Sequence, residues 1–225
     1  LMKDICKQLN IDTKKYKEST FLNAISSAKD ELKTPEQYAD EVAKEYNKKI
    51  FGRVYKEYQK RLKQNNALDF DDLIMLTVQL FRQNAEILNH YQERFPFILV
   101  DEYQDTNTAQ FTLLSLLASR YQNLCVVGDD DQSIYRFRGA NIHNILNFEK
   151  IFPATKVIRL EQNYRSTKNI LAAASGVIKH NSMRKEKTLW TTAEAGAPIS
   201  YGRYDNEYEE AQGIAADIHR QVKDG

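Results

Sequence analysis

The fold of this 225-residue chain is decided by the stretch Phe97-Ile98-Leu99-Val100-Asp101-Glu102-Tyr103-Gln104-Asp105. Four apolar residues that end in paired carboxylates are typical of a short strand buried on both faces of a parallel α/β sheet. Ligands of such sheets bind at the carboxyl ends of the strands, where Asp101 and Glu102 emerge. One carboxylate there can hold Mg²⁺ while its neighbour accepts a proton from an attacking water. Taken alone, the two acids also fit a solvated turn or a helix cap.

Residues 124–128 and 156–160 are further predicted strands, and each runs into a polar motif. The chain thus holds three motifs in order: DEYQD at 101–105, GDDDQSIYRFRGA at 128–140 and LEQNYRST at 160–167. They resemble motifs II, III and IV of the UvrD/PcrA/Rep group of superfamily-one DNA helicases. The segment ALDFDDL at 67–73 extends this resemblance, which covers essentially the whole chain. It implies an α/β fold built on a RecA-like P-loop NTPase motor domain.

The resemblance also divides the chain into three parts. Residues 1–66 look like an inserted all-helical subdomain, 1B, and residues 67–155 like the C-terminal half of RecA-like domain 1A. Residues 156–225 look like the N-terminal part of a second RecA-like domain, 2A. Because subdomain 1B lies beside duplex DNA in this family, the basic residues between 44 and 63 are candidates for phosphate contacts. The alternative for these residues is an ordinary solvated face.

The phosphate-binding P-loop is not in the sequence. Such a loop ends in Gly-Lys-Ser/Thr, and none of the eight glycines is followed by lysine. The family carries this motif near its amino terminus and carries motifs V and VI after motif IV. We therefore expect an internal fragment of a larger motor, with negligible ATPase activity and weak nucleotide affinity of its own.

Local patterns predict the helices. Thr34-Pro35-Glu36-Gln37 predicts a helix start with a capping box. Apolar residues then recur at every fourth position and predict one long helix. They are Tyr38, Val42, Tyr46, Ile50, Val54, Tyr58 and Leu62. Asp69 is expected to cap a helix through Leu80. Other helices are predicted over 85–94, 106–119, 167–180 and 206–223, and a last strand over 198–204.

The resemblance assigns the catalytic roles. It implies that Asp101 coordinates Mg²⁺, that Glu102 is the general base for the hydrolytic water, and that Gln132 senses the terminal phosphate of ATP. Arg165 would reach that phosphate from the other side of the cleft, since guanidinium combines planar donors with a permanent charge. Tyr164 would lie against the nucleotide base, with core packing as the alternative.

The remaining residues of these motifs fit structural roles as well. Gln104 and Asp105 complete motif II, and a structural hydrogen bond is as good an explanation for each as a ligand contact. The three consecutive acids Asp129, Asp130 and Asp131 favour a polar turn over a metal cluster, because neighbouring residues rarely point at one ion.

Single-stranded DNA is the expected track. Tyr135, Phe137 and Arg138 interleave aromatic rings with charge, which suits base stacking and phosphate contact without sequence choice. Phe70 is a further candidate for this track, with core packing as the rival explanation. The resemblance implies 3'-to-5' movement driven by Mg-ATP, with single-stranded DNA and junctions of single- and double-stranded DNA as partners.

Composition excludes several other classes. With 42% hydrophobic and 28% charged residues the chain is globular, and a net charge of +1 allows only a local nucleic-acid patch. No apolar run reaches the roughly 18 residues of a membrane span. Cys6 and Cys125 are too far apart in sequence to suggest a zinc site, and Cys125 is expected to be a buried thiol in its strand. We expect a cytoplasmic monomer that works with DNA repair or replication proteins.

Two other functions remain open on the sequence. The chain could be a stand-alone DNA-binding module without hydrolysis. Alternatively, the carboxylates could serve a metal-dependent nuclease or phosphatase, which would leave Gln132 and Arg165 without a task.

Overall fold

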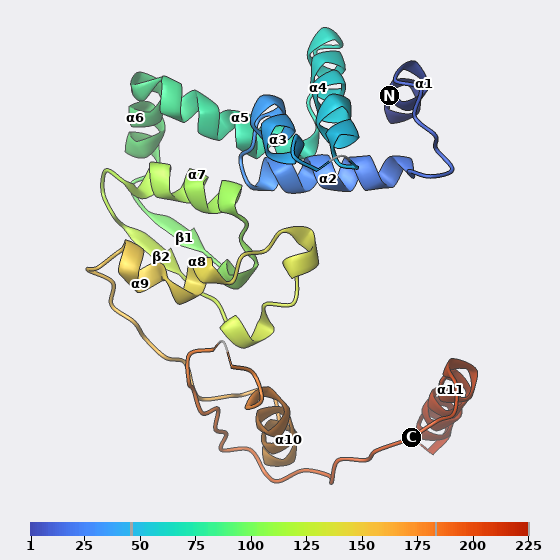
Figure 1. Cartoon of the computed structure of the whole chain (residues 1–225). Coiled ribbons are helices and arrows are strands. Elements are labelled where there is room, and N and C mark those ends of the chain that lie inside the picture. Colours follow the sequence, from blue (N-terminus) through green and yellow to red (C-terminus); the bar gives the residue numbers. More distant parts are fainter. Residues whose placement is uncertain (46, 183, 225) are drawn as a thin grey trace. The chain divides into compact units, whose positions relative to one another are not determined.

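The computed structural model describes residues 1–45, 47–182 and 184–224. The chain divides into two compact units, Leu1–Lys156 and Val157–Gly225, and each is described by itself. Figure 1 shows the course of the chain through its helices and the small sheet. No helix among the described residues is long and apolar enough to cross a bilayer.

The first unit begins with helices and then adds two strands. Its helices are α1 (Met2–Gln8), α2 (Glu18–Asp30), α3 (Pro35–Val42), α4 (Lys49–Gln64), α5 (Phe70–Gln83), α6 (Ala85–Arg94), α7 (Thr108–Ala118), α8 (His143–Leu146) and α9 (Phe148–Ile151). Its strands are β1 (Ile98–Val100) and β2 (Leu124–Val126). Short 3-10 turns occupy Tyr103–Asp105, Asp130–Gln132 and Arg136–Arg138.

The capping box predicted at Thr34 and the helix cap predicted at Asp69 are both confirmed. The Thr34 side chain accepts a hydrogen bond from the backbone N–H of Gln37, and the Gln37 side chain accepts one from the N–H of Thr34. Asp69 and Asp72 form the same reciprocal pair at the start of α5. These local hydrogen bonds satisfy amide groups that the first turn of a helix leaves without partners.

The single long helix predicted after Thr34 is wrong, because α3 ends at Val42 and α4 starts at Lys49. The predicted stripe residue Tyr46 lies outside the described residues. A Cβ on Gly52 would lie 2.8 Å from the Cα of Ala39, so the two helices pack against each other at this point. In one straight helix these residues would be about 20 Å apart. The chain turns back because packing α3 on α4 buries both apolar faces.

The helices at the amino-terminal end share one hydrophobic core. It includes Phe21, Ile25, Val54 and Tyr55, all essentially inaccessible to solvent. A buried cation lies beside it: Lys29 Nζ is 2.6 Å from Asp69 Oδ2 and 2.8 Å from Asp72 Oδ1. This group therefore ties the end of α2 to the start of α5.

The two strands pair in parallel, with Ile98 opposite Leu124, Leu99 opposite Cys125 and Val100 opposite Val126. The strands themselves are therefore confirmed, but their burial on both faces is not. Leu99 is 79% exposed and Cys125 is exposed beside it, so the predicted buried thiol is wrong. Paired residues point to the same face of a sheet. The described part of the chain leaves that face open to solvent.

The second unit contains α10 (Lys168–Ile178) and α11 (Glu207–Asp224), close to the predicted helices. The strands predicted over 156–160 and 198–204 are wrong, since neither range pairs into a ladder among the described residues. A single parallel bridge joins Gln162 to Trp190 instead. Strands need partners for their backbone groups, and among the described residues neither predicted range has a strand paired with it.

Candidate functional site

The two acids of DEYQD stand at a sharp turn directly after β1. Glu102 has a left-handed backbone, with φ 49° and ψ 40°, which is uncommon for a residue with a side chain. Asp101 Oδ1 accepts a hydrogen bond of 2.9 Å from the backbone N–H of Glu102, and the N–H of Tyr103 donates to Val127 O at 2.9 Å. The turn thus leaves both carboxylates exposed at the carboxyl end of the strand.

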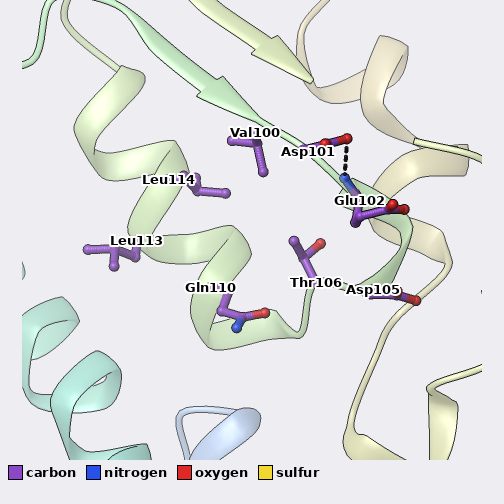
Figure 2. Close-up of a pocket in the computed structure, with 8 residues that line it drawn as sticks. All are labelled: Val100, Asp101, Glu102, Asp105, Thr106, Gln110, Leu113 and Leu114. Carbon is purple, nitrogen blue, oxygen red and sulfur yellow. Dashed lines mark hydrogen bonds between the residues drawn. The ribbon is translucent and has the colours of Figure 1, made fainter. Parts of the chain in front are cut away.

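An open pocket of about 360 Å³ lies beside these acids, between the end of β1 and α7 (Figure 2). Its lining residues are Val100, Asp101, Glu102, Asp105, Thr106, Gln110, Leu113 and Leu114. Burial, followed by the charge of Glu102, raises the pKa of the Asp105 carboxyl. Its Oδ1 is buried and has no hydrogen-bond partner. The pocket therefore combines carboxylate oxygens on one wall with apolar side chains on the other.

These carboxylates fit a magnesium ion. Mg²⁺ takes oxygen ligands and keeps several of its waters, so it is usually held by one or two protein carboxylates. Asp101 offers such a group at the strand end, and Glu102 stands next to it where a bound water could be deprotonated. Among the described residues there is no cluster of three or more ligand side chains that would hold a metal by itself.

Gln104 connects the end of β1 to the segment that follows β2. This buried side chain donates from Nε2 to Glu102 Oε2 at 2.7 Å, and its Oε1 accepts from the N–H of Asp129 at 2.9 Å. A Cβ on Gly128 would lie 2.6 Å from Gln104 Oε1, so only glycine allows this approach. The structural hydrogen bond considered for Gln104 on the sequence is thus present.

Gln132, in the motif at 128–140, joins the same network. Its Nε2 donates to Asp129 Oδ2 at 2.8 Å, and Asp129 Oδ1 accepts from the N–H of Asp131 at 2.9 Å. The three acids form the predicted polar turn. Two intermediates, Gln104 and Asp129, therefore link Glu102 to Gln132, which lies 30 positions later in the sequence.

The aromatic and basic residues that follow this turn, Tyr135, Phe137 and Arg138, lie close together. The rings of Tyr135 and Phe137 are 6.0 Å apart, and the Arg138 guanidinium lies 5.2 Å and 5.5 Å from their centroids. Phe137 is 78% exposed. Phe70, the first residue of α5, is 89% exposed, so core packing does not explain it. Flat exposed rings beside a guanidinium are suited to stacking with bases.

Arg165 and Tyr164 belong to the second unit. The Tyr164 ring is 84% exposed, which excludes the core alternative, and its hydroxyl donates to Gln162 Oε1 at 2.8 Å. The backbone N–H groups of Arg165 and Ser166 donate to Asn163 Oδ1 at 3.0 Å and 2.8 Å. Asn163 thus shapes the turn that presents the exposed Arg165 side chain.

Comparison with known proteins matches these motifs to one family. Residues 1–153 match the family model described as UvrD/REP helicase N-terminal domain, and residues 158–225 match the UvrD-like helicase C-terminal domain. The chain belongs to the UvrD/REP helicase family. The resemblance inferred from the three motifs is therefore confirmed, and the family indicates a RecA-like helicase fold.

Several relatives in this family are similar over the full chain. An ATP-dependent DNA helicase PcrA of Bacillus subtilis (strain 168) is 56% identical over 220 residues, which is 98% of this chain and 30% of the relative. The proteins of the same name from Staphylococcus epidermidis (strain ATCC 12228 / FDA PCI 1200) and Staphylococcus aureus (strain NCTC 8325 / PS 47) are each 52% identical over 225 residues. Those matches cover 100% of this chain and 31% of each relative. The chain thus spans about a third of the length of these helicases.

Proposed function

We propose that the chain is part of an ATP-dependent DNA helicase that couples Mg-ATP hydrolysis to 3'-to-5' movement along single-stranded DNA and to duplex unwinding. The hydrogen-bonded link from Glu102 through Gln104 and Asp129 to Gln132 carries this proposal. It joins a general-base candidate to an amide that can donate or accept as a phosphate leaves. Neither a nuclease nor a simple binding module needs that connection. The proposal places the protein in the cytoplasm with its DNA.

In this proposal each part of the chain has one task. Residues 1–66 form subdomain 1B, residues 67–155 belong to RecA-like domain 1A, and residues 156–225 begin domain 2A. Asp101 binds the Mg²⁺ of Mg-ATP, and the ion neutralises phosphate charge when bound. Glu102 accepts the proton of the hydrolytic water.

The other site residues contact either the nucleotide or the DNA. Gln132 contacts the terminal phosphate and transmits its loss to the turn that carries Tyr135, Phe137 and Arg138. Arg165 contributes positive charge to the terminal phosphate, and Tyr164 packs on the base of the nucleotide. Phe70 adds a stacking surface for single-stranded DNA. These roles rest on the motif match together with the exposure of the side chains.

The 225-residue chain is expected to bind single-stranded DNA without turning over ATP, because no glycine in it is followed by the lysine of a P-loop. Binding is measured by fluorescence anisotropy with labelled oligo(dT), and turnover by phosphate release with Mg-ATP and the same DNA. Phe137→Ala should weaken DNA binding by about fivefold or more, since stacking contributes about 1–3 kcal/mol per base.

Other outcomes would favour the alternatives. DNA cleavage without ATP that is lost in Asp101→Asn would indicate a nuclease. ATP hydrolysis by the chain alone that is lost in Glu102→Gln would contradict the expected dependence on a P-loop. DNA binding that Phe137→Ala and Arg138→Ala leave unchanged would contradict the assigned DNA track.

A further inference from the structure

The turn that carries Tyr135, Phe137 and Arg138 is held at both ends: before it the Ser133 hydroxyl donates to Gln104 O at 3.3 Å, and after it the N–H of Asn141 donates to Thr106 O at 2.9 Å. Its two rings and its guanidinium contact one another, and Phe137 projects into solvent. The turn closes at Gly139, whose φ of +85° places it in the left-handed region. Because Gly139 ends the turn, a contact that fixes Gly139 helps to set the direction in which the exposed rings point.

Asp30, the last residue of α2, reaches that glycine from 109 positions earlier in the sequence. Its Oδ2 is so close that a Cβ on Gly139 would lie 2.4 Å from it. Its other oxygen, Oδ1, accepts a hydrogen bond of 2.6 Å from Asn107 Nδ2. One carboxylate thus touches both the end of the aromatic turn and the residue before α7.

Asn107 is itself firmly placed. Its Oδ1 caps α7 by accepting from the N–H of Gln110 at 2.8 Å, and its backbone carbonyl accepts from Asn144 Nδ2 at 3.3 Å. The buried Asn144 side chain also donates to Thr106 O at 3.0 Å, and the N–H of Asn141 donates to the same oxygen at 2.9 Å. The segment after the turn is therefore anchored on the two residues that follow motif II.

The other side of the contact is anchored by the core. Lys29, next to Asp30, is fully buried between Asp69 and Asp72 at the start of α5. Since α2 packs against α4, α5 and α7, the end of this helix has little freedom to move (Figure 1). Asp30 thus stands at a rigid point from which it can restrain a more exposed loop.

We propose that Asp30 is a positioning residue for DNA binding: held by Asn107, its carboxylate fixes Gly139 and so orients the rings of Tyr135 and Phe137. The inference rests on the proposed role of this turn as part of the DNA track. Asp30 itself touches no DNA in this scheme. Asp30 connects the helices of residues 1–66 to the motif at 128–140, which carries both Gln132 and the aromatic residues of the proposed DNA track.

Three variants of the 225-residue chain test the proposal: Asp30→Ala removes the contact, Asp30→Asn keeps the acceptor for Asn107, and Glu31→Ala alters the neighbouring exposed acid. Amide hydrogen exchange of residues 135–140 is measured by mass spectrometry in the free chain, with α6 as an internal reference. Loss of the hydrogen bond between Asn107 and Asp30, together with the close contact at Gly139, should speed exchange of residues 135–140 in Asp30→Ala by about tenfold. Asp30→Asn and Glu31→Ala should exchange as the unsubstituted chain does.

The same proteins are then titrated with labelled oligo(dT). Affinity should fall about fivefold in Asp30→Ala and should be restored in Asp30→Asn, because a misdirected ring loses part of its stacking. Unchanged exchange at residues 135–140 in Asp30→Ala would overturn the proposal. So would faster exchange with unchanged DNA affinity.

Failure of the chain to bind DNA and failure of a variant to fold have different consequences for the proposal. If the unsubstituted chain does not bind oligo(dT), the proposed DNA role fails, and the exchange data still decide whether Asp30 fixes the turn. If Asp30→Ala does not fold, as judged by circular dichroism, Asp30→Ser replaces it. This shorter side chain withdraws the carboxylate from both Gly139 and Asn107 and should speed exchange at residues 135–140 with α6 unchanged. Unchanged exchange in Asp30→Ser would overturn the proposal.

Discussion

The helical region, residues 1–66, and the sheet region, residues 97–132, are held together in different ways. In the helical region Phe21, Val54 and Tyr55 are fully buried in a shared core. In the sheet region Leu99 lies largely in solvent, and the segments are joined by the hydrogen bonds of polar side chains such as Gln104. The helical region therefore acts as the rigid support, while the site residues stand on a framework with less buried apolar surface.

The largest stability loss is expected when the buried cation of the helical region is removed. Lys29→Met leaves Asp69 and the buried Asp72 without their cation, which typically costs about 3–5 kcal/mol. The matched change Lys33→Met breaks part-exposed ion pairs with Glu31 and Glu41 and should cost no more than about 1 kcal/mol. Urea unfolding measures both. Equal losses would show that the buried group has no special role.

The same residue type should behave differently in the two regions. Leu62→Ala removes a buried side chain from the helical core and should lower the free energy of unfolding by about 2–5 kcal/mol. Leu99→Ala changes an exposed side chain in β1 and should stay within about 0.5 kcal/mol. Thermal and urea unfolding of the two variants check this. A large loss for Leu99→Ala would mean that the open face of the sheet is covered in solution.

The caps of α3 and α7, Thr34 and Asn107, should differ less in their contribution to stability. Thr34→Ala removes one cap in the helical region and should cost about 1 kcal/mol. Asn107→Ala removes the cap of α7 together with the hydrogen bond to Asp30, so its loss should be about 1.5–3 kcal/mol larger. Urea unfolding of both variants gives the comparison. If the two losses are equal, the Asp30 contact adds nothing to the cap.

A further effect concerns the pH dependence of stability. Burial, followed by the charges of Asp71 and Glu31, raises the pKa of Asp30 from 3.8 to about 6. A raised pKa in the folded state favours the protonated form, so the stability this group contributes is complete below about pH 4 and is lost as the pH rises through 6. Relative to Asp30→Asn, the unsubstituted chain should lose stability as the pH rises from about 4 to 6. Urea midpoints from pH 4 to 7 test this, and a constant difference would contradict the raised pKa.

The sequence predicts local structure well where neighbours decide it. The capping box predicted at Thr34 and the cap predicted at Asp69 depend on residues three positions apart, and both are present. The break between α3 and α4 depends on the contact of Gly52 with Ala39, which no periodicity indicates. The exposure of Leu99 and Cys125 likewise depends on which segments cover the sheet, and an apolar run does not specify this.

In the candidate site, too, the features set by neighbouring residues could be predicted and those set by long-range contacts could not. The position of Asp101 and Glu102 at a strand end could be predicted, because strand and acids are adjacent in sequence. The contact of Asp30 with Asn107 could not, since 77 positions separate two ordinary polar residues. The sequence indicates Gln104 only as part of its motif, because its bond to the N–H of Asp129 depends on the parallel pairing of β1 and β2.

We propose that Glu102 acts as the general base of an ATP-hydrolysing motor, and one hybrid protein tests this role directly. This chain replaces the matching segment of the Bacillus subtilis relative, and ATP hydrolysis stimulated by single-stranded DNA is measured. We predict turnover that falls about 100-fold or more in Glu102→Gln, the usual effect of losing a general base. The exposed Glu86→Gln should keep full activity. Turnover by Glu102→Gln equal to that of the unsubstituted hybrid would contradict the account.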